Sequence, residues 1–381
     1  MRVLLVNRLM GIAWGGGESF DCNIARTLTA KGEKVRVLTG QPLLAAPGKV
    51  PADLTVSYLR SPYLRDLTYK WAGKIPKVPF ALLQADLRLF EHAAFRWISA
   101  NRASFDVIEI LALPRLARRV SQALRMPVVL RYPGPPSSRW DVPILSSLKS
   151  NPRFACFAAG DAYLQLQKHN IPAQDIPQGV DQGHFHKCAT AVRQRLGIHE
   201  GSTLLLSCGR LAPGKGFEFL IDTFLDIAPR RPDLALMVVG DGILRQKLQQ
   251  RVVSGGLTHR VFFTGRISHD NLPEYYSAAD IFLLLSPYEN FSNTVLEAMS
   301  TGLPVITTDV GGFPLQVREG VNGMRVPHGD RDRLTDAISR LADDVSLREK
   351  MGATNREETA RRYTWSSCAD ALLGLYQRIV G

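Results

Sequence analysis

Short apolar runs separated by helical stretches constrain the fold of this chain more than any other feature of its sequence. The runs lie at 2–7, 35–39, 54–59, 106–111 and 127–132, and again at 203–210, 234–239, 261–265, 281–286 and 304–308. Runs of this kind indicate buried strands, and their alternation with helices predicts parallel, doubly wound sheets. The series occurs twice in 381 residues, which is enough chain for two separate cores. We therefore predict an α/β protein with two Rossmann-like domains.

The joint between the two series is predicted at Ile176–Asp181, where a proline and a glycine interrupt the pattern. This places one domain at residues 1–178 and a second at residues 179–362. A last amphipathic pattern runs from about Trp365 to Val380. Residues 363–381 are therefore expected to form a helix that packs back towards the N-terminal domain.

The sequence shows no feature of a membrane-spanning or disulfide-linked protein. No apolar run reaches the 18 or so residues that a membrane span requires, and the opening run is typical of a buried strand rather than a signal peptide. The five cysteines are scattered and never at metal-ligand spacing, which is typical of a reducing compartment. His184 and His186 have no cysteine or carboxylate partners in the pattern, so we expect them at the surface or in packing. We expect a cytoplasmic protein without a bound metal.

The net charge of +12 is distributed unevenly along the chain. Residues 1–180 contain 24 Lys and Arg against 12 Asp and Glu, whereas residues 181–381 contain 23 of each. An excess confined to one half suggests an anionic partner for that half, such as a membrane surface, a phosphorylated acceptor or nucleic acid. A generally basic surface that favours solubility is the simpler alternative.

The segment from Tyr58 to Arg102 mixes aromatic and basic residues, a composition typical of helices at a membrane interface. Prolines at 76 and 79 divide it and leave a predicted helix from about Phe80 to Asn101. Its apolar positions form one stripe, at 80, 83, 87, 90, 94 and 97. The stripe either faces the core or lies on an anionic bilayer.

The stretch from Ser286 to Pro304 carries two carboxylates, Glu289 and Glu297, eight positions apart. Ser292 is a predicted N-cap of a helix of about two turns, because its hydroxyl can accept from free amides of the first turn. Glu289 then lies in the loop before the helix, and Glu297 projects from inside it. The helix N-terminus between them favours an anion such as a diphosphate, and each carboxylate can bind the hydroxyls of a polyol.

Two fixed cations, Arg210 and Lys215, follow the first strand of the second series. They fall at a strand end and in the following loop, where a parallel sheet forms its ligand crevice. Neutralising the charge that builds on a leaving diphosphate is the chemistry such cations perform. In the first half, the turn Gly15-Gly16-Gly17-Glu18 opens a helix after a strand, which allows close approach of a phosphate or sugar to the backbone.

Taken together, these motifs resemble those of the retaining glycosyltransferases of family four, which have the two-domain GT-B fold. The matching segments are Gly15-Gly16-Gly17-Glu18, Pro177-Gln-Gly-Val-Asp181 with Phe185, Gly209-Arg210-Leu-Ala-Pro-Gly-Lys215-Gly216, Gly240-Asp-Gly242, Phe263-Thr-Gly265, Ala279-Asp280, Glu289-x7-Glu297, and Gly302-Leu-Pro-Val-Ile306 before Gly311-Gly312. The second half matches almost throughout, and the first half mainly at its opening.

The resemblance implies that two Rossmann-like domains face a central cleft, with an acceptor-binding domain at residues 1–178 and a nucleotide-sugar-binding domain at residues 179–362. It also implies that a sugar is transferred from a nucleotide-diphosphate donor with retention of configuration. Arg210, Lys215 and Glu289 would be the catalytic residues: the two cations would bind the diphosphate, and Glu289 would bind the hydroxyls of the transferred sugar. Glu297 would bind the ribose. The other residues implied in donor binding are Gly16, Gly17, Gly209, Gly265, Arg266, Asn290, Phe291, Ser292, Asn293 and Thr294. The donor is a co-substrate, and no cofactor or metal is implied.

The chain departs from the family pattern after its fifth strand. Many relatives show a His-Gly pair there, whereas this chain has Arg131-Tyr132-Pro-Gly134. If relatives use that imidazole to contact sugar or acceptor, then either Arg131 or Tyr132 takes its place here or the contact is lost. Glu109 and Glu18 are further candidates for binding an acceptor hydroxyl.

The sequence thus predicts a hexosyltransferase that uses a UDP- or GDP-sugar and a glycan acceptor, lipid-linked or phosphorylated, in cell-surface polysaccharide, lipopolysaccharide or glycoconjugate synthesis. It is expected to act in the cytoplasm, with the inner membrane face as a possible site of peripheral attachment. A sugar-nucleotide hydrolase or epimerase of the same fold is one alternative. A non-catalytic polyanion-binding protein is another, although no nucleic-acid motif supports it and no nucleic-acid partner is expected.

Overall fold

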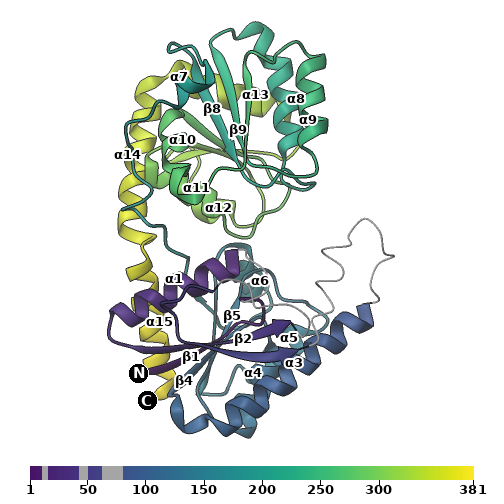
Figure 1. The fold of residues 1–381 in the computed structure, drawn as a ribbon, viewed down its shortest axis with the longest axis vertical. Helices are drawn as coiled ribbons and strands as arrows, with labels where there is room; N and C mark the ends of the chain where they lie inside the picture. The colour runs from purple at the N-terminus through teal and green to yellow at the C-terminus, as the bar shows by residue number, and fades with distance from the viewer. Residues whose placement is uncertain (11–15, 43–49, 62–79) are drawn as a thin grey trace. The chain divides into compact units, whose positions relative to one another are not determined.

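The computed structural model describes residues 1–10, 16–42, 50–61 and 80–381 (Figure 1). The chain divides into two compact units. Unit 1 consists of Met1–Gln178 together with Trp365–Gly381, and unit 2 of Gly179–Thr364. Each unit is built on one parallel sheet with helices on both faces, which confirms the predicted α/β class with doubly wound sheets.

Unit 1 contains a seven-stranded sheet. Its spatial order is β3 (Val56–Ser61), β2 (Lys34–Pro42), β1 (Arg2–Val6), β4 (Val107–Leu111), β5 (Val128–Tyr132), β6 (Phe154–Ala158) and β7 (Gln174–Asp175). The first strand pairs in parallel with β2 on one side and with β4 on the other. The order of the strands therefore reverses at β1, and a sheet of this type binds ligands beyond the carboxyl ends of the strands at such a point.

Helices cover both faces of the unit 1 sheet and bury a separate core on each. One core contains residues of α3 (Phe80–Ala100), α4 (Pro114–Ala123), α5 (Asp141–Leu148) and α6 (Gly160–Lys168). The other contains residues of α1 (Gly16–Ala30) and the C-terminal helix α15 (Trp365–Val380). Figure 1 shows α1 and α15 on one face and α3 and α4 on the other.

Unit 2 contains a six-stranded sheet. Its spatial order is β10 (Val261–Gly265), β9 (Leu234–Val239), β8 (Thr203–Cys208), β11 (Ile281–Leu284), β12 (Val305–Thr308) and β13 (Gly323–Val326). Strand β8 lies between β9 and β11, so the order reverses at β8. The loop with Arg210 and Lys215 follows β8, and the loop with Glu289 follows β11. Both loops therefore lie at the carboxyl edge, where the strands end.

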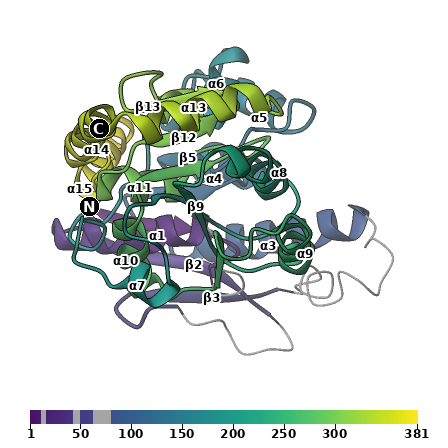
Figure 2. The ribbon, with the colours of Figure 1, turned by 90° about the horizontal axis from the view of Figure 1, so that it is seen from above.

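The helices of unit 2 are likewise divided between two cores. One core includes residues of α8 (Phe217–Ile227), α9 (Arg245–Ser254) and α13 (Arg331–Asp343). The other includes residues of α10 (Leu272–Ala278), α11 (Asn293–Thr301) and the short α7 (Val192–Leu196) and α12 (Phe313–Gln316). Figures 1 and 2 show α8 and α9 on one side of β8 and β9, with α10 and α11 on the other. Helix α14 (Val345–Arg362) contacts α11.

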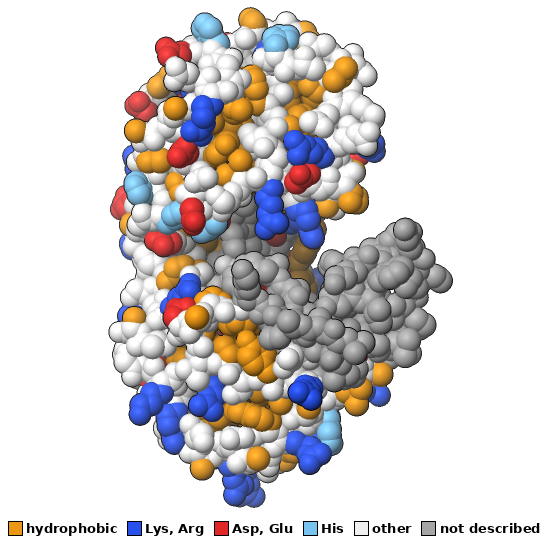
Figure 3. Space-filling model, viewed as in Figure 1, with side chains coloured by type: hydrophobic (Ala, Val, Ile, Leu, Met, Phe, Trp, Pro, Cys, Tyr) orange, Lys and Arg blue, Asp and Glu red, His pale blue; other side chains and the backbone are white. Residues whose placement is uncertain are grey.

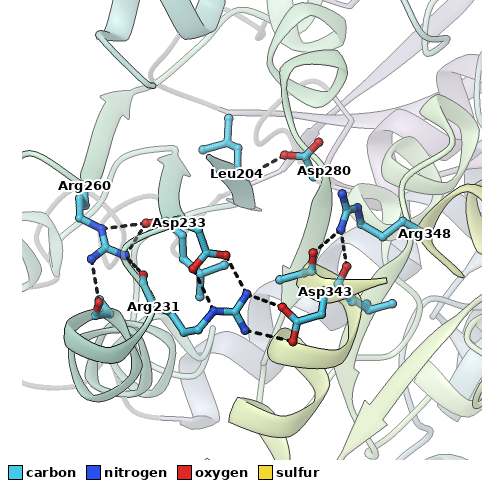
Figure 4. Close-up of polar contacts among 11 residues, drawn as sticks. Leu204, Arg231, Asp233, Arg260, Asp280, Asp343 and Arg348 are labelled. Atoms are coloured by element: carbon cyan, nitrogen blue, oxygen red, sulfur yellow. Dashed lines mark hydrogen bonds and ion pairs between the residues drawn. The ribbon is translucent and has the colours of Figure 1, made fainter. Parts of the chain in front are cut away.

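Polar contacts link neighbouring strands at the amino edge of the unit 2 sheet (Figure 4). Arg260 donates to the carbonyls of Ala228 and Leu234, and Asp280 accepts from the backbone amide of Leu204 at 2.7 Å. Arg231 bridges Asp233 and Asp343. These contacts hold neighbouring strand starts together, because each arginine binds several acceptors at once.

Three strands of the structure have no counterpart in the sequence prediction: β6, β7 and β13. Strand β7 has only two residues, and β13 begins with a glycine and includes an arginine. Strand β6 contains two alanines and a cysteine among its five residues. Short or small-residue segments carry a weak strand signal. Here β6, β7 and β13 take their conformation from pairing with the parallel neighbours β5, β6 and β12, respectively.

The apolar stripe of the predicted helix 80–101 lies in α3, and its described part faces the core. Phe90, Ala94 and Ile98 are buried, and Leu87 and Trp97 pack against the same core. The core interpretation of this part of the stripe is therefore confirmed. The aromatic and basic positions at 62–79, which include Tyr63, Tyr69 and Trp71, lie outside the described residues, as do the side chains at 80–84.

Candidate active site

Close backbone contacts bring two loops together at the carboxyl edge of unit 2. Gly216 has φ +76°, and a Cβ at this position would lie 2.1 Å from the carbonyl oxygen of Leu285. Only glycine permits both the left-handed conformation and this approach. The loop after β8 is thereby fixed against the end of β11, next to the loop that carries Glu289.

Lys215 and Glu289 form an ion pair across these loops. The Lys215 Nζ lies 2.9 Å from Oε2 of Glu289, and both side chains are partly exposed. The Glu289 carbonyl accepts from the amide of Gly312 at 2.9 Å, while a Cβ at Gly311 would lie 2.2 Å from the same oxygen. Glu289 is thus fixed through its backbone by the glycine turn and through its side chain by Lys215.

The helix N-terminus next to this pair is capped as predicted. Ser292 precedes α11, and its Oγ accepts from the amide of Val295 at 3.3 Å. The buried Gln316 binds the backbone of Ser292 in both directions, because Oε1 accepts from its amide at 2.8 Å and Nε2 donates to its carbonyl at 2.9 Å. Gly302 ends the helix with φ +85°, which confirms the predicted C-terminal boundary.

Glu297 projects from α11 into a mostly buried environment. The hydroxyl of the fully buried Tyr276 donates to Oε2 of Glu297 at 2.7 Å. Burial raises the pKa of Glu297 to about 7, while the Tyr276 hydrogen bond and the charge of His184 act in the opposite direction. Oε1 is the carboxylate oxygen that this hydrogen bond does not use. Near neutral pH this carboxyl group can therefore exist in either charge state.

The remaining donor-site candidates lie in the same loops or at neighbouring strand ends. Arg210 and Arg266 are exposed, at the carboxyl ends of β8 and β10. Gly265 has φ +73°, and a Cβ there would lie 3.1 Å from Nη1 of Arg245. Phe291 packs on Tyr363 with ring centroids 6.0 Å apart. The other candidates of this unit are Gly209, Asn290, Asn293 and Thr294, which lie at the end of β8 or around the start of α11.

The candidates of unit 1 lie in or near α1, β4 and β5. Gly16 and Gly17 are the first residues of α1, and Gly15 lies outside the described residues. Among the described residues, no atom lies within 4 Å of a Cβ added at Gly16, and the atom nearest to one at Gly17 is 3.6 Å away. Glu18 follows them in the first turn of α1 and is buried.

Arg131 and Glu109 are buried in one polar cluster, and this limits their predicted role in binding an acceptor. The Arg131 guanidinium pairs with Asp21, lies 4.0 Å above the ring of Phe20, and its Nη2 is 3.3 Å from the carbonyl of Gly17. Its Nε lies 3.5 Å from Oε1 of Glu109. Arg131 therefore connects β5 to the first turns of α1.

Glu109 also binds the C-terminal helix. The hydroxyl of Tyr376 in α15 donates to Oε2 of Glu109. Burial raises the pKa of Glu109 to about 7, and the neighbouring Arg131 lowers it. Tyr132 is buried as well. Direct acceptor contact by these residues stays a prediction, and their burial indicates that they position other groups.

The sequence analysis missed four residues that hold candidate site residues in place: Tyr276, Gln316, Asp21 and Tyr376. Asp21 gave a signal, because it is a charged residue within the apolar pattern of α1 and lies one helical turn after Gly17. The other three act across elements that are distant in sequence, so no local spacing indicates them.

At the carboxyl edge of unit 2, this arrangement combines exposed cations, a capped helix N-terminus and two carboxylates. Cations and free helix amides bind phosphate oxygens. Carboxylates accept hydrogen bonds from hydroxyl groups. The site can therefore bind a molecule that contains both a diphosphate and polyol groups.

Comparison with known proteins gives the same picture. Residues 189–358 match the family model described as "Glycosyl transferases group 1". The chain is 32% identical over 188 residues to the alpha-D-kanosaminyltransferase of Streptomyces kanamyceticus, which covers 49% of this chain and 48% of that protein. It is 29% identical over 220 residues to the lipopolysaccharide core biosynthesis mannosyltransferase LpsB of Rhizobium meliloti, which covers 55% of this chain and 62% of LpsB.

These matches span about half of the first relative and less than two thirds of the second. Among solved structures, Anabaena HepE in complex with UDP superposes with a TM-score of 0.77 at 20% identity. That comparison covers 99% of this chain and 100% of HepE. At this identity the match shows a shared fold, and that fold is GT-B.

Proposed function

The chain belongs to the group 1 glycosyltransferase family through residues 189–358, and from this we propose that it transfers a sugar from a nucleotide-diphosphate donor to a glycan acceptor. The observation that carries the proposal is the Lys215–Glu289 pair, 2.9 Å apart and adjacent to the capped N-terminus of α11. The pair places a cation that can bind the diphosphate next to a carboxylate that can accept hydrogen bonds from the sugar hydroxyl groups.

The chemical groups of the donor can each be assigned to residues along the carboxyl edge of unit 2. Arg210, Lys215 and the first amides of α11 would bind the diphosphate, whose charge increases as the glycosidic bond breaks. Glu289 would accept from hydroxyl groups of the transferred sugar, and Oε1 of Glu297 from the ribose. That HepE has been solved in complex with UDP supports a nucleotide ligand of this kind.

Retention of configuration follows from the family resemblance. In a front-face reaction, the bond between the anomeric carbon and the diphosphate oxygen breaks as the acceptor oxygen approaches from the same side. The acceptor proton passes to the leaving phosphate oxygen. Arg210 and Lys215 stabilise the departing diphosphate, so replacement of either cation slows bond cleavage more than it weakens folding.

The acceptor that we propose is a glycan in cell-surface polysaccharide or glycoconjugate synthesis, either lipid-linked or phosphorylated. The excess positive charge of residues 1–180 supports an anionic acceptor. The name of LpsB, which refers to lipopolysaccharide core biosynthesis, supports a lipid-linked one.

A donor screen with matched variants tests the transferase proposal. UDP-, GDP- and ADP-sugars are added to purified protein, and thermal shift and nucleotide release are measured. One donor should raise the unfolding midpoint, because a ligand that binds only the native state stabilises it. Glu289→Gln and Lys215→Ala should each reduce turnover by about 100-fold or more.

Lys247→Ala is the control, since Lys247 is an exposed lysine of unit 2 that also forms an ion pair, with Glu218. It should retain turnover. Near-normal turnover in both site variants would exclude the proposal. Donor consumption at the same rate with and without any acceptor glycan would instead identify a sugar-nucleotide hydrolase.

We also propose that unit 1 binds the anionic inner face of the membrane through a basic surface on α3, α4 and the segments that follow them. Its exposed cations are Arg88, Arg96, Arg102, Arg118, Arg119, Arg125, Lys149 and Arg153. The carboxylates among described residues 85–155 are buried or partly buried. Figure 3 shows blue side chains spread over the visible part of unit 1 with few red ones between them. Among the described residues, no helix is long and apolar enough to span a bilayer.

Liposome co-sedimentation tests this surface. Vesicles with anionic lipid should bind the protein at low salt and release it at high salt, because exposed charges are screened. Arg96→Gln with Arg118→Gln should weaken binding, whereas Arg333→Gln with Arg361→Gln, two exposed arginines of unit 2, should not. Absence of binding at low salt would remove membrane association and leave the transferase proposal intact.

A further inference from the structure

The loop between β5 and α5 exposes an aromatic side chain at the carboxyl edge of unit 1. Trp140 is the last residue before α5, and 48% of it is exposed. It is the one exposed aromatic residue at this edge among the described residues, since the exposed Tyr58 lies within β3. Single exposed apolar residues are common on protein surfaces, so the exposure of Trp140 matters here because of its place at a ligand-binding edge and its contact with a cation.

The backbone fixes Trp140 at this place. The amide of Trp140 donates to Oγ of Ser137 at 3.3 Å, and the amide of Ser137 donates to Oδ2 of Asp141 at 2.9 Å. The amide of Asp141 in turn donates to the Ser137 carbonyl at 2.9 Å. Prolines at 133, 135 and 136 restrict the approach to this turn. The indole is therefore exposed on an ordered turn.

Arg139 completes the surface. Its guanidinium carbon lies 4.7 Å from the centroid of the Trp140 ring, in cation–π geometry, and the residue is exposed. One guanidinium can therefore stack on the indole and still donate to an anion, because it has five N–H groups. Arg139 and Trp140 therefore place a positive charge and an exposed aromatic ring in contact on one turn.

The residues that sequence reasoning assigned to acceptor contact do not expose such a surface. Glu109, Arg131 and Tyr132 are all at most 5% exposed. Arg139 and Trp140 follow Tyr132 by a few residues and lie at the same edge of the sheet. At this edge, Arg139 and Trp140 are exposed to solvent, whereas the cluster around Arg131 is buried.

We propose that Trp140 and Arg139 form a subsite of unit 1 that binds an acceptor sugar ring carrying a phosphate or carboxylate group. The C–H face of the sugar packs on the indole, as apolar groups pack on aromatic faces, and the anion accepts from the Arg139 guanidinium. This inference rests on the proposed function, because it specifies the acceptor of that reaction.

Saturation-transfer NMR on the full chain tests the subsite. The probes are glucose 6-phosphate and the uncharged methyl α-D-glucopyranoside, and the donor site is first saturated with the nucleoside diphosphate that gives the largest thermal shift. Trp140→Ala should weaken glucose 6-phosphate binding about tenfold, equivalent to about 1.4 kcal/mol. Trp140→Phe should retain most of the binding, since it keeps an aromatic face.

Arg139→Gln should lower the affinity for glucose 6-phosphate to that for the methyl glucoside and leave the latter unchanged. Tyr58→Ala, which removes an exposed aromatic residue of the same unit, should have no effect. The subsite is excluded if Trp140→Ala binds glucose 6-phosphate as the wild type does, or if the wild type binds neither probe. The thermal shift caused by the nucleotide is a separate readout. If the nucleotide stabilises the protein but neither sugar binds, only the subsite is rejected. If no nucleotide stabilises the protein, the donor site itself is rejected.

Discussion

At the scale of single residues, Glu297 is the donor-site candidate whose charge state depends on its burial. Burial raises its pKa to about 7, and the Tyr276 hydrogen bond lowers it. In the ionised form, Oε1 of Glu297 can accept from ribose hydroxyls while Oε2 accepts from Tyr276, whereas protonation removes part of this acceptor capacity. We therefore expect affinity for the nucleotide to fall as the pH drops through 7, by about tenfold between pH 8 and pH 6 if only the ionised form binds.

Isothermal titration calorimetry with the nucleoside diphosphate across this pH range measures the effect. Tyr276→Phe should move the midpoint to higher pH, because it removes a hydrogen bond that favours the ionised form. Glu297→Gln should remove the part of the dependence that this carboxyl group causes and leave only that of the terminal phosphate, whose pKa is about 6. His184→Asn controls for the neighbouring imidazole. A pH profile identical in wild type and Glu297→Gln would contradict this assignment.

At the scale of elements, the glycine turn after β12 sets the position of the Glu289 loop. Gly311 has φ +56°, and its Cβ position lies 2.2 Å from the Glu289 carbonyl oxygen. Gly320 has a similar φ of +71° with nothing within 4 Å of that position. Alanine at Gly320 should therefore cost only the strain of the left-handed conformation, about 1–2 kcal/mol of unfolding free energy.

Gly311→Ala should cost more than this by about 1–3 kcal/mol, because the Glu289 loop must also shift away from the added methyl group. It should also lose the thermal shift by the donor, whereas Gly320→Ala should keep it. Urea denaturation and donor titration of the two variants measure both effects. Equal destabilisation by the two substitutions would show that the contact with Glu289 does not constrain the loop.

At the scale of the whole molecule, the chain returns to unit 1 at its end. Helix α15 packs on α1, and Ala369, Leu372 and Tyr376 are part of the core that α1 covers. Tyr376 then reaches Glu109 of β4, 267 positions earlier in the sequence. Unit 1 is therefore complete only when the last helix has been added, and the central strand β4 is connected to both ends of the chain.

The sequence alone determined the features that depend on neighbouring residues. Apolar runs predicted strands such as β1 and β5, and the amphipathic pattern at the end predicted α15. Side-chain chemistry at the helix ends predicted that Ser292 caps α11 and that Gly302 ends it. Patterns of this kind need only a few adjacent residues, because helix caps and strand burial are local. Strands β6, β7 and β13 were missed because their local signal is weak.

Only the tertiary structure decided which side chains meet and which are exposed. From the sequence, Arg131 and Glu109 were predicted to contact an acceptor because they lie at strand ends, and Trp140 was not singled out. Folding buries Arg131 and Glu109 among Asp21 and Tyr376 and leaves Trp140 at the surface. Likewise, Tyr276 meets Glu297 only because α10 and α11 pack on the same face of the sheet. Contacts of this kind depend on strand order and helix packing, and both are set by the burial of the whole core rather than by local spacing.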